Sequence, residues 1–254
     1  MVIRKHKNCP GRYSLFRAVF FIILIFVASC ASIQENSSGH PDFSFFQDKP
    51  FTEETASWLN EGTQSRITPA IAQEASQING SNRRERLYKA VDYVWKNFNF
   101  NNWYSDKAFA LTADELFRTR NLGGCSDFAL VSVVLFRSAG IPSRLVITAN
   151  VDWMQAFQKN DLLITTGHTF VEAYLEEKWH LIDPTNRLLF EGYDETQRSY
   201  PNMEYLCLRG TDYWDMGVTG ISDLNSVLRK EAGSFKTEKY KRPEYKQISL
   251  KNIK

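Results

Sequence analysis

Three side chains in the middle of the chain are of the types that together perform nucleophilic catalysis. Cys125 supplies a thiol, His168 an imidazole and Asp183 a carboxylate. A thiolate attacks a carbonyl carbon, an imidazole takes the thiol proton and returns it to a leaving amine, and a carboxylate orients the imidazole and stabilises its charged form. These residue types predict covalent chemistry at an amide, provided that the fold brings them together.

Cys125 precedes an apolar segment that is delimited at both ends. Gly123 and Gly124 come immediately before it, Gly140-Ile141-Pro142 follows it, and residues 128–136 between them are apolar except Ser132. We expect a helix over 125–139 that is buried on most sides. Unpaired N–H groups and the positive end of the helix dipole stabilise an anion at a helix N-terminus. The position of Cys125 therefore predicts a thiol whose pKa is lowered.

A β-hairpin is expected to bring His168 and Asp183 together. Apolar residues recur with period two over 170–175 and 179–182, and the polar residues between them form a turn. Residues that face each other across this turn have numbers that sum to about 351–353, and 168 and 183 sum to 351. The two side chains should lie opposite each other, or one step off, within contact distance. Pro184 restricts Asp183 to an extended backbone and helps to hold it in place.

Two further helices are expected before the cysteine segment. From Arg84 to Phe98, apolar residues at spacings of three and four predict a helix with one apolar face. Thr112 and Glu115 stand three residues apart just before apolar residues, as in a capping box. They predict the start of a shorter helix at about 113–118.

Four blocks of sequence extend the pattern around these three residues. In order, they are Gly123-Gly124-Cys125-Ser126-Asp127-Phe128-Ala129, Arg137-Ser138-Ala139-Gly140-Ile141-Pro142-Ser143-Arg144, His168-Thr169-Phe170-Val171-Glu172 and Trp179-His180-Leu181-Ile182-Asp183-Pro184-Thr185. Across about residues 84–190 the chain resembles the transglutaminase-like superfamily. The resemblance implies an α+β, papain-like fold in which N-terminal helices and a buried helix bearing Cys125 pack on an antiparallel β-sheet that carries His168 and Asp183. It also implies catalytic roles for these three residues and no cofactor.

The neighbours of the thiol bear on the type of reaction. Animal crosslinking transglutaminases have Gln before and Trp after the nucleophile, whereas Gly124 and Ser126 flank Cys125 here. We therefore expect a transglutaminase-like cysteine protease, amidase or acyltransferase. It would hydrolyse or transfer acyl groups at peptide or side-chain amides of a peptide or protein, through a thioester. The alternatives are a true protein-crosslinking transglutaminase and a non-catalytic module that binds a peptide on the same fold.

Catalysis of this kind also needs an oxyanion hole, in which N–H donors point at the developing negative charge. The backbone N–H of Cys125 is one candidate donor. Trp103, Tyr104 and Asn121 are candidates for the second donor.

The N-terminal segment resembles a bacterial lipoprotein signal. Five Lys and Arg residues precede the apolar run Ala18–Ala28, which has 11 residues, whereas a membrane-spanning helix needs about 20. The run ends at Val27-Ala28-Ser29-Cys30, which resembles a lipobox with cleavage before Cys30 and a lipid on its thiol. Cleavage without lipidation is the alternative. We expect a protein anchored by lipid in the bacterial cell envelope, at the outer membrane or the outer face of the inner membrane.

The expected organisation follows from these segments. Residues 1–29 form the signal peptide, 30–50 a polar tether, 51–232 the transglutaminase-like domain and 233–254 a basic C-terminal tail. The tail has few large apolar residues and many Lys and Arg residues, so we expect a solvated extension outside the core.

Composition excludes several classes of protein. With 43% hydrophobic residues, the chain resembles an ordinary globular protein. Between residues 30 and 228 it has 17 Lys and Arg against 26 Asp and Glu residues, so we expect no nucleic-acid partner. Loss of Cys9 and acylation of Cys30 leave Cys125 and Cys207, which excludes a multi-disulfide framework but allows one bridge. The histidines lack paired ligand spacing, and we predict no metal.

A structural role is expected for several other residues. His180 faces away from Asp183, so we expect it to be structural or exposed. We expect Cys207 to be a core residue, Asp127 a helix cap and Arg144 an ion-pair partner. Tyr213 and Trp214 are expected to pack as a pair.

Overall fold

The computed structural model describes residues 42–161 and 164–251. The predicted signal peptide at 1–29, the predicted lipidation site Cys30 and the first part of the tether lie outside the described residues. Within the two described ranges, no helix is both long enough and apolar enough to cross a membrane.

The chain forms helices both before and after the segment that begins with Cys125. Those that precede it are α1 (Glu53–Ser57), α2 (Pro69–Ala75), α3 (Arg83–Asn97), the 3-10 helix η1 (Asn102–Lys107) and α4 (Ala113–Thr119). The cysteine opens α5 (Cys125–Ser138), and the later helices are α6 (Val151–Gln158), η2 (Pro201–Met203), α7 (Ile221–Ser234) and η3 (Thr237–Lys239).

Helix α3 starts and ends within a residue of its predicted bounds. Asn82 caps it, because its side-chain oxygen accepts a hydrogen bond from the N–H of Glu85. The predicted apolar face is buried through Leu87, Ala90, Val91 and Val94. Trp95, at the edge of that face, is 40% exposed.

Helix α4 begins with the predicted capping box. The Thr112 hydroxyl accepts from the N–H of Glu115, and the Glu115 carboxylate accepts from the N–H of Thr112. Leu116 and Phe117 then face the core. The chain leaves the helix through Arg120 in the left-handed region, at φ 57°.

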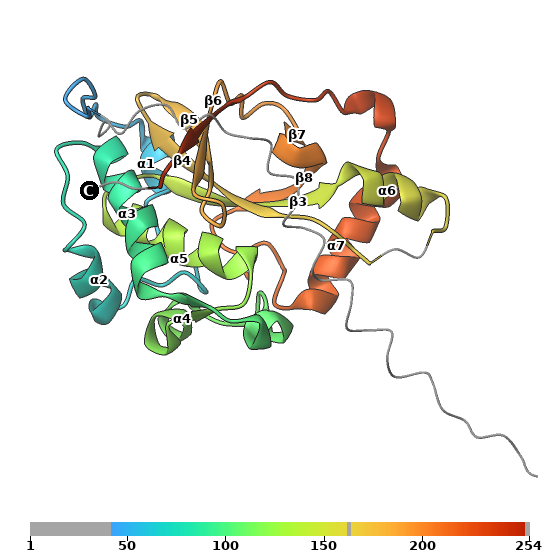
Figure 1. Ribbon diagram of the computed structural model, residues 1–254, viewed down its shortest axis with the longest axis horizontal. Coiled ribbons are helices and arrows are strands. Elements are labelled where there is room, and N and C mark those ends of the chain that lie inside the picture. The colour runs from blue at the N-terminus through green and yellow to red at the C-terminus, as the bar shows by residue number, and fades with distance from the viewer. Residues whose placement is uncertain (1–41, 162–163, 252–254) are drawn as a thin grey trace, which may run out of the picture. The chain divides into compact units, whose positions relative to one another are not determined.

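Helix α5 is buried along nearly its whole length, as its composition predicts. Every residue from Ser126 to Arg137 is buried. Helices α3 and α4 pack against it on one side, and strands β3 (Ser143–Asn150) and β4 (Thr169–Leu175) pack against it on the other. Figure 1 shows α5 between the sheet and the other helices. Burial of this apolar surface holds α5, and with it Cys125, in place.

The sheet has seven strands in the order β7-β8-β3-β4-β5-β6-β9, and every neighbouring pair is antiparallel. Beside β3 and β4, its strands are β5 (Lys178–Asp183), β6 (Leu188–Glu191), β7 (Ser199–Tyr200), β8 (Glu204–Gly210) and β9 (Lys246–Ser249). A separate parallel pair is formed by β1 (Asn99–Phe100) and β2 (Asn121–Leu122). The buried side chains form two clusters. The larger one joins the helices to the sheet, and the smaller one is mainly aromatic and includes Phe170, Trp179 and Tyr200. The α+β, papain-like fold class is therefore confirmed.

The predicted hairpin is formed by β4 and β5. Its turn has positive φ at Glu176 (46°) and Glu177 (62°), the combination required by a two-residue type I′ connection. Val171 faces Ile182, so facing numbers sum to 353. Continued by one residue, this register sets Phe170 opposite Asp183, and His168 is two residues further along. His168 and Asp183 thus are diagonal neighbours on the two strands, with His168 two residues away from the position directly opposite Asp183.

The C-terminal tail joins the fold, and the prediction that it stays outside the core is wrong. Strand β9 pairs with β6 at the edge of the sheet. Leu250 is fully buried, and Ile248 is half-buried against the core. Residues 248 and 250 lie on one face of an extended chain, and β6 offers unpaired backbone groups to it. The tail therefore pairs with the sheet and buries apolar side chains, although it is rich in Lys and Arg residues.

The described end of the tether also contacts the domain. The Asn82 amide donates to the carbonyl of Phe43 (2.7 Å), and Arg86 pairs with Asp48 (2.8 Å). The Arg83 guanidinium lies over the Phe51 ring at 3.7 Å from its centroid. Residues 43–51 thus lie against the start of α3.

Candidate active site

Cys125 is the first residue of α5 and is half-buried. Gly124 before it is extended, with φ 178° and no side chain to cap the helix. A Cβ at Gly124 would meet no atom within 4 Å, so the space before the helix is open. The first N–H groups of a helix have no partner earlier in the same helix, and Cys125 stands at this end of α5.

Asp127 holds the turn before the helix. Its carboxylate accepts a hydrogen bond of 2.7 Å from the N–H of Gly123, in agreement with the predicted capping role. Burial raises the pKa of Asp127 to about 6, although the bonds from Gly123 and Ser126 act in the opposite direction. Asp127 therefore positions the backbone next to Cys125.

His168 and Asp183 form a hydrogen-bonded pair. The imidazole Nε2 lies 3.0 Å from Oδ2 of Asp183, whose side chain is fully buried. Asp183 also accepts from the backbone N–H of Asn186 (3.0 Å) and from its side-chain amide (2.7 Å). The ring of Phe170 packs edge-on against the imidazole at 4.7 Å. These contacts fix the orientation of the ring and leave Nδ1 free for the thiol.

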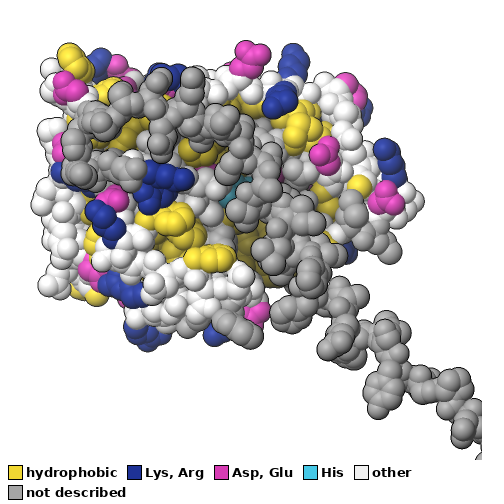
Figure 2. All heavy atoms as spheres, in the orientation of Figure 1, with side chains coloured by type: hydrophobic (Ala, Val, Ile, Leu, Met, Phe, Trp, Pro, Cys, Tyr) yellow, Lys and Arg dark blue, Asp and Glu magenta, His cyan; other side chains and the backbone are white. Residues whose placement is uncertain are grey.

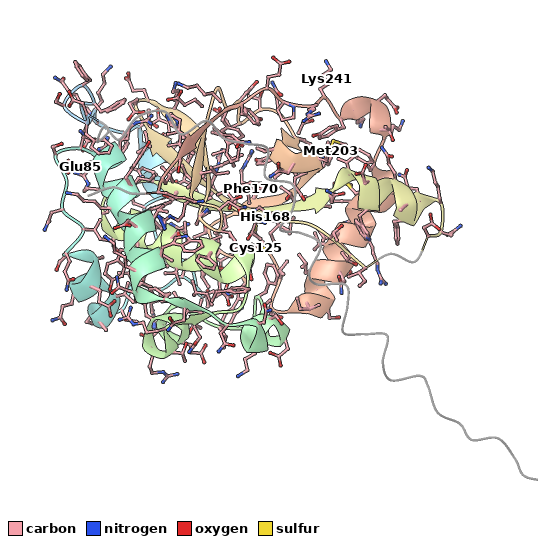
Figure 3. All side chains as sticks on the ribbon, viewed as in Figure 1. Glu85, Cys125, His168, Phe170, Met203 and Lys241 are labelled. Atoms are coloured by element: carbon pink, nitrogen blue, oxygen red, sulfur yellow. The ribbon has the colours of Figure 1, made fainter. Side chains whose placement is uncertain are left out.

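The electrostatics couple all three side chains. Burial lowers the pKa of His168, but the charges of Asp183 and Cys125 outweigh it and raise that pKa well above its ordinary value. Burial raises the pKa of the Cys125 thiol, but the charge of His168 and hydrogen bonds with His168 and Thr169 bring it below the ordinary value. Figure 3 shows Cys125 and His168 adjacent at the end of α5. The geometry favours a thiolate beside an imidazolium.

Three residues that the sequence did not single out, Thr148, Glu204 and Gly167, help to position the backbone of His168. The hydroxyl of Thr148 donates to the buried carboxylate of Glu204 (2.7 Å) and accepts from the N–H of His168 (3.3 Å). The N–H of Thr148 donates to the carbonyl of His168 (3.0 Å). A Cβ at Gly167 would lie 2.2 Å from the carbonyl oxygen of Thr148, so this close approach requires glycine. In the sequence, only Gly167, next to the candidate histidine, could have indicated this close approach of two backbone segments.

A cleft of about 350 Å³ opens at the thiol. Its lining comes from distant parts of the chain, namely the end of η1 and the loop after it, the start of α5, strand β3 with the segment before β4, and the first turns of α7. Cys125, His168, Thr148, Phe109 and Leu224 are among the lining residues. A substrate carbonyl in the cleft would therefore have access to the thiol and the imidazole together.

The second oxyanion donor is not identified among the predicted residues. Asn121, in β2, does not line the cleft, and its amide donates to the carbonyl of Thr119 (2.7 Å). Trp103 and Tyr104 lie in η1, directly before the cleft-lining Ser105.

The residues expected to be structural have structural contacts. His180 is buried and pairs with Glu176 at 3.2 Å, so it is not exposed. Cys207 is buried in the core, and it and Cys125 are both free thiols. The hydroxyl of Tyr213, a fully buried residue, donates to the carbonyl of Ser126. The Trp214 indole donates to the carbonyl of Phe109.

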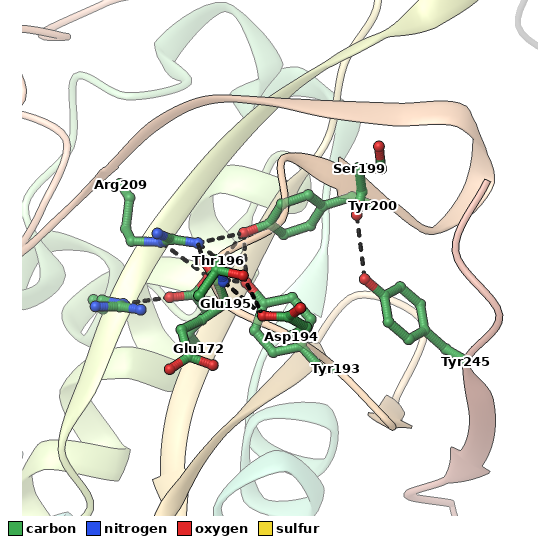
Figure 4. A network of polar contacts seen from close by, with 10 residues as sticks. Glu172, Tyr193, Asp194, Glu195, Thr196, Ser199, Tyr200, Arg209 and Tyr245 are labelled. Atoms are coloured by element: carbon green, nitrogen blue, oxygen red, sulfur yellow. Dashed lines mark hydrogen bonds and ion pairs between the residues drawn. The ribbon is translucent and has the colours of Figure 1, made fainter. Parts of the chain in front are cut away.

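Arg144 forms an ion pair with the buried carboxylate of Glu172, as predicted. Glu172 is fully buried and accepts from Arg144, from Arg209 (2.7 and 3.0 Å) and from the hydroxyls of Tyr193 and Tyr200. Figure 4 shows this network, in which two cations and two phenols converge on one carboxylate. Burial and the charge of Glu172 raise the pKa of both tyrosines. The network joins β3, β4 and β8 and belongs to the scaffold of the site.

Across residues 42–161 and 164–251, no group of three or more His, Cys, Asp and Glu side chains is arranged to hold a metal ion.

Comparison with known proteins points to one family. The family model described as "Transglutaminase-like superfamily" matches residues 70–184. No curated protein matches the chain. Among solved structures, a candidate cysteine protease from Cytophaga hutchinsonii shares 20% identity at a TM-score of 0.48, over 66% of this chain and 50% of the other.

Two further solved structures are similar over smaller shares. A TGase shares 15% identity at a TM-score of 0.34, over 53% of this chain and 33% of its own. A candidate protease from Parabacteroides distasonis ATCC 8503 shares 17% identity at a TM-score of 0.34, over 59% of this chain and 27% of its own. The matched part of this chain thus spans half or less of the length of these structures.

Proposed function

We propose that this chain is a thiol-dependent enzyme of the bacterial cell envelope. The match of residues 70–184 to the model of the transglutaminase-like superfamily supports the enzyme class. The enzyme hydrolyses or transfers acyl groups at peptide or side-chain amides of a peptide or protein, through a thioester on Cys125. The observation that carries this proposal is the placement of Cys125 and His168 at one cleft, with the 3.0 Å bond that joins His168 to the buried Asp183.

The reaction follows from this geometry. The Cys125 sulfur attacks the amide carbonyl carbon, and the electron pair of the C=O bond moves onto the oxygen. When the C–N bond breaks, His168 gives its proton to the leaving amine. Water or a second amine then attacks the thioester carbon, His168 takes a proton from it, and the Cys125 thiolate leaves. Asp183 stabilises the imidazolium at each stage and is not itself protonated.

The oxyanion would lie at the N-terminus of α5. The backbone N–H of Cys125 points to this end of the helix, where the helix dipole also favours negative charge. Trp103 and Tyr104, which directly precede the cleft-lining Ser105, stay as proposals for the second donor, whereas Asn121 does not line the cleft.

The test is the pH dependence of iodoacetamide labelling in the full chain, followed by mass spectrometry of the peptide that carries Cys125. We expect rapid labelling well below pH 8.5, about the pKa of an unperturbed thiol. His168→Ala should lose the labelling at low pH. Cys207, buried with its pKa raised chiefly by that burial, is an internal control that should not label without denaturant.

Labelling of Cys125 only at alkaline pH, or only in denaturant, would overturn the proposal. Turnover of a fluorogenic peptide then separates the enzyme from a binding module. Cys125→Ala should abolish turnover and retain binding. A variant equal to wild type in every assay would indicate the module. Incorporation of a primary amine into a glutamine-bearing protein would indicate true crosslinking.

We further propose that the chain reaches the envelope through a lipid on Cys30. The support is the short apolar run followed by the lipobox-like Val27-Ala28-Ser29-Cys30. A single acyl chain binds a membrane only weakly, so stable anchoring requires the multiple chains of a mature lipoprotein. Cys30→Ser should abolish incorporation of labelled palmitate and release the chain from the membrane fraction. Palmitate incorporation into the Cys30→Ser variant would refute the lipid site.

A further inference from the structure

The cleft at Cys125 is lined almost without charge. Apart from Cys125 and His168 themselves, none of its described lining residues has an ionisable side chain. The polar groups are those of Ser, Thr and Asn residues, and the remainder are Gly, Ala, Ile, Leu and Phe. On the face shown in Figure 2, hydrophobic side chains likewise gather toward the middle. Apart from the thiol and imidazole themselves, a charged substrate side chain in this cleft would find no counter-charge among its described lining residues.

Helix α7 contributes an apolar stripe to this lining. Ile221, Leu224 and Leu228 follow each other at spacings of three and four, so they share one face of the helix. Leu228 is buried in the core, Leu224 is half-buried and Ile221 is 41% exposed. The stripe thus continues the hydrophobic core into the cleft.

None of the charged residues of α7 lines the cleft. Asp223 accepts from the N–H and hydroxyl of Thr219, and Glu231 pairs with Arg198 (2.8 Å). Neither residue lines the cleft. The part of α7 that lines the cleft therefore has no charged residue that could bind a charged substrate side chain.

We propose that the acyl group transferred to Cys125 has an apolar, uncharged side chain next to its carbonyl, and that Ile221 and Leu224 select it. This inference rests on the proposed function, because it names the substrate class of the same thiol. The volume of the cleft lies at the low end of the range for ligand pockets, which fits one or two residues. Burying a charged side chain there without a partner would be penalised, whereas an apolar one gains from contact with the stripe.

The test measures alkylation of Cys125 in the full chain by N-acetyl amino-acid chloromethyl ketones with Leu, Ala, Asp or Lys side chains. The thiolate sulfur forms a bond to the chloromethyl carbon and chloride leaves with the bonding electrons, so no turnover is needed. Each rate constant is divided by that for iodoacetamide, which removes differences in thiol reactivity. We expect the Leu reagent to exceed Ala at least about tenfold, and to exceed Asp and Lys by more, since even one methylene is worth about tenfold or more in an apolar pocket.

Two variants of α7 sharpen the test. Ile221→Asp adds a carboxylate at the cleft and is compatible with the helix, because the first turn favours acids. It should lower the normalised Leu rate and raise that of Lys, changing their ratio about tenfold or more. Ser226→Asp adds the same charge at an exposed position of α7 outside the cleft lining and should leave the ratio unchanged.

The outcomes separate this inference from the function on which it rests. If Cys125 labels with iodoacetamide as proposed but the reagents show no preference for Leu, or favour a charged side chain, only the substrate class is wrong. An equal effect of Ile221→Asp and Ser226→Asp would remove the role of the stripe. If Cys125 does not label at all in the folded chain, the proposed function fails and this inference fails with it.

Discussion

Replacement of Asp183 by Asn removes one charge from the site with little change in shape. The carboxylate is fully buried, 3.0 Å from Nε2 of His168, and accepts two further bonds from Asn186. Its charge is the largest influence that raises the pKa of His168. The amide can still accept a hydrogen bond but cannot stabilise an imidazolium by charge. We expect the pKa of His168 to fall and that of Cys125 to rise toward its ordinary value.

The size of the effect follows from the geometry of the pair. Charges about 4 Å apart at an effective dielectric constant of about 20 interact by about 4 kcal/mol. A retained neutral hydrogen bond offsets about 1 kcal/mol of this. The remaining 3 kcal/mol or so corresponds to about a hundredfold loss, since about 1.4 kcal/mol is a factor of ten.

The assay is the rate of Cys125 labelling by iodoacetamide from pH 5 to 9 in wild type and Asp183→Asn. The variant should label about a hundredfold more slowly near pH 6 and approach the wild-type rate at alkaline pH. Asp212→Asn is the matched control, because Asp212 is equally buried, accepts from the N–H groups of Gln64 and Ser65, and does not line the cleft. An unchanged pH profile in Asp183→Asn, or the same change in both variants, would refute the reasoning.

Three further predictions concern stability, each measured by urea unfolding. Glu172→Gln leaves Arg209 and its partners without their buried counter-charge and should cost about 3–5 kcal/mol, whereas the exposed Glu191→Gln should cost about 1 kcal/mol or less; equal costs would contradict a role for the network. Burial raises the pKa of Asp127 from 3.8 to about 6, so the stability that its protonated form contributes is complete below about pH 4 and is lost as pH rises through 6. Relative to wild type, Asp127→Asn should therefore gain about 3 kcal/mol between pH 4 and pH 7, and parallel pH profiles would count against this. Leu250→Ala should cost about 2–5 kcal/mol because Leu250 is fully buried, and an unchanged midpoint would mean that the tail does not contribute to the fold.

Patterns that depend on neighbours in the chain were predictable from the sequence. The capping box of Thr112 and Glu115 is a local contact over three residues, and the burial of α5 follows from its composition. The pairing of β4 with β5 follows from a two-residue turn and period-two alternation. These rules also brought His168 near Asp183, although the register sets them diagonally rather than face to face.

The C-terminal strand shows where such rules end. Lys and Arg residues dominate the composition of the tail, yet β9 pairs with β6 and Leu250 enters the core. An edge strand far away in sequence supplied the partner backbone. Composition describes a segment by itself and carries no information about an unpaired edge elsewhere in the fold.

The sequence by itself predicted Cys125, His168 and Asp183 as candidate site residues, because local rules place the thiol at a helix N-terminus and the other two at one hairpin. Only the tertiary structure decided what surrounds them. Glu204 reaches His168 through Thr148 because β8 lies beside β3, and Leu224 reaches the cleft because α7 packs against the same strands. Contacts between residues separated by 50 or more positions depend on strand order and helix packing, which no local periodicity encodes.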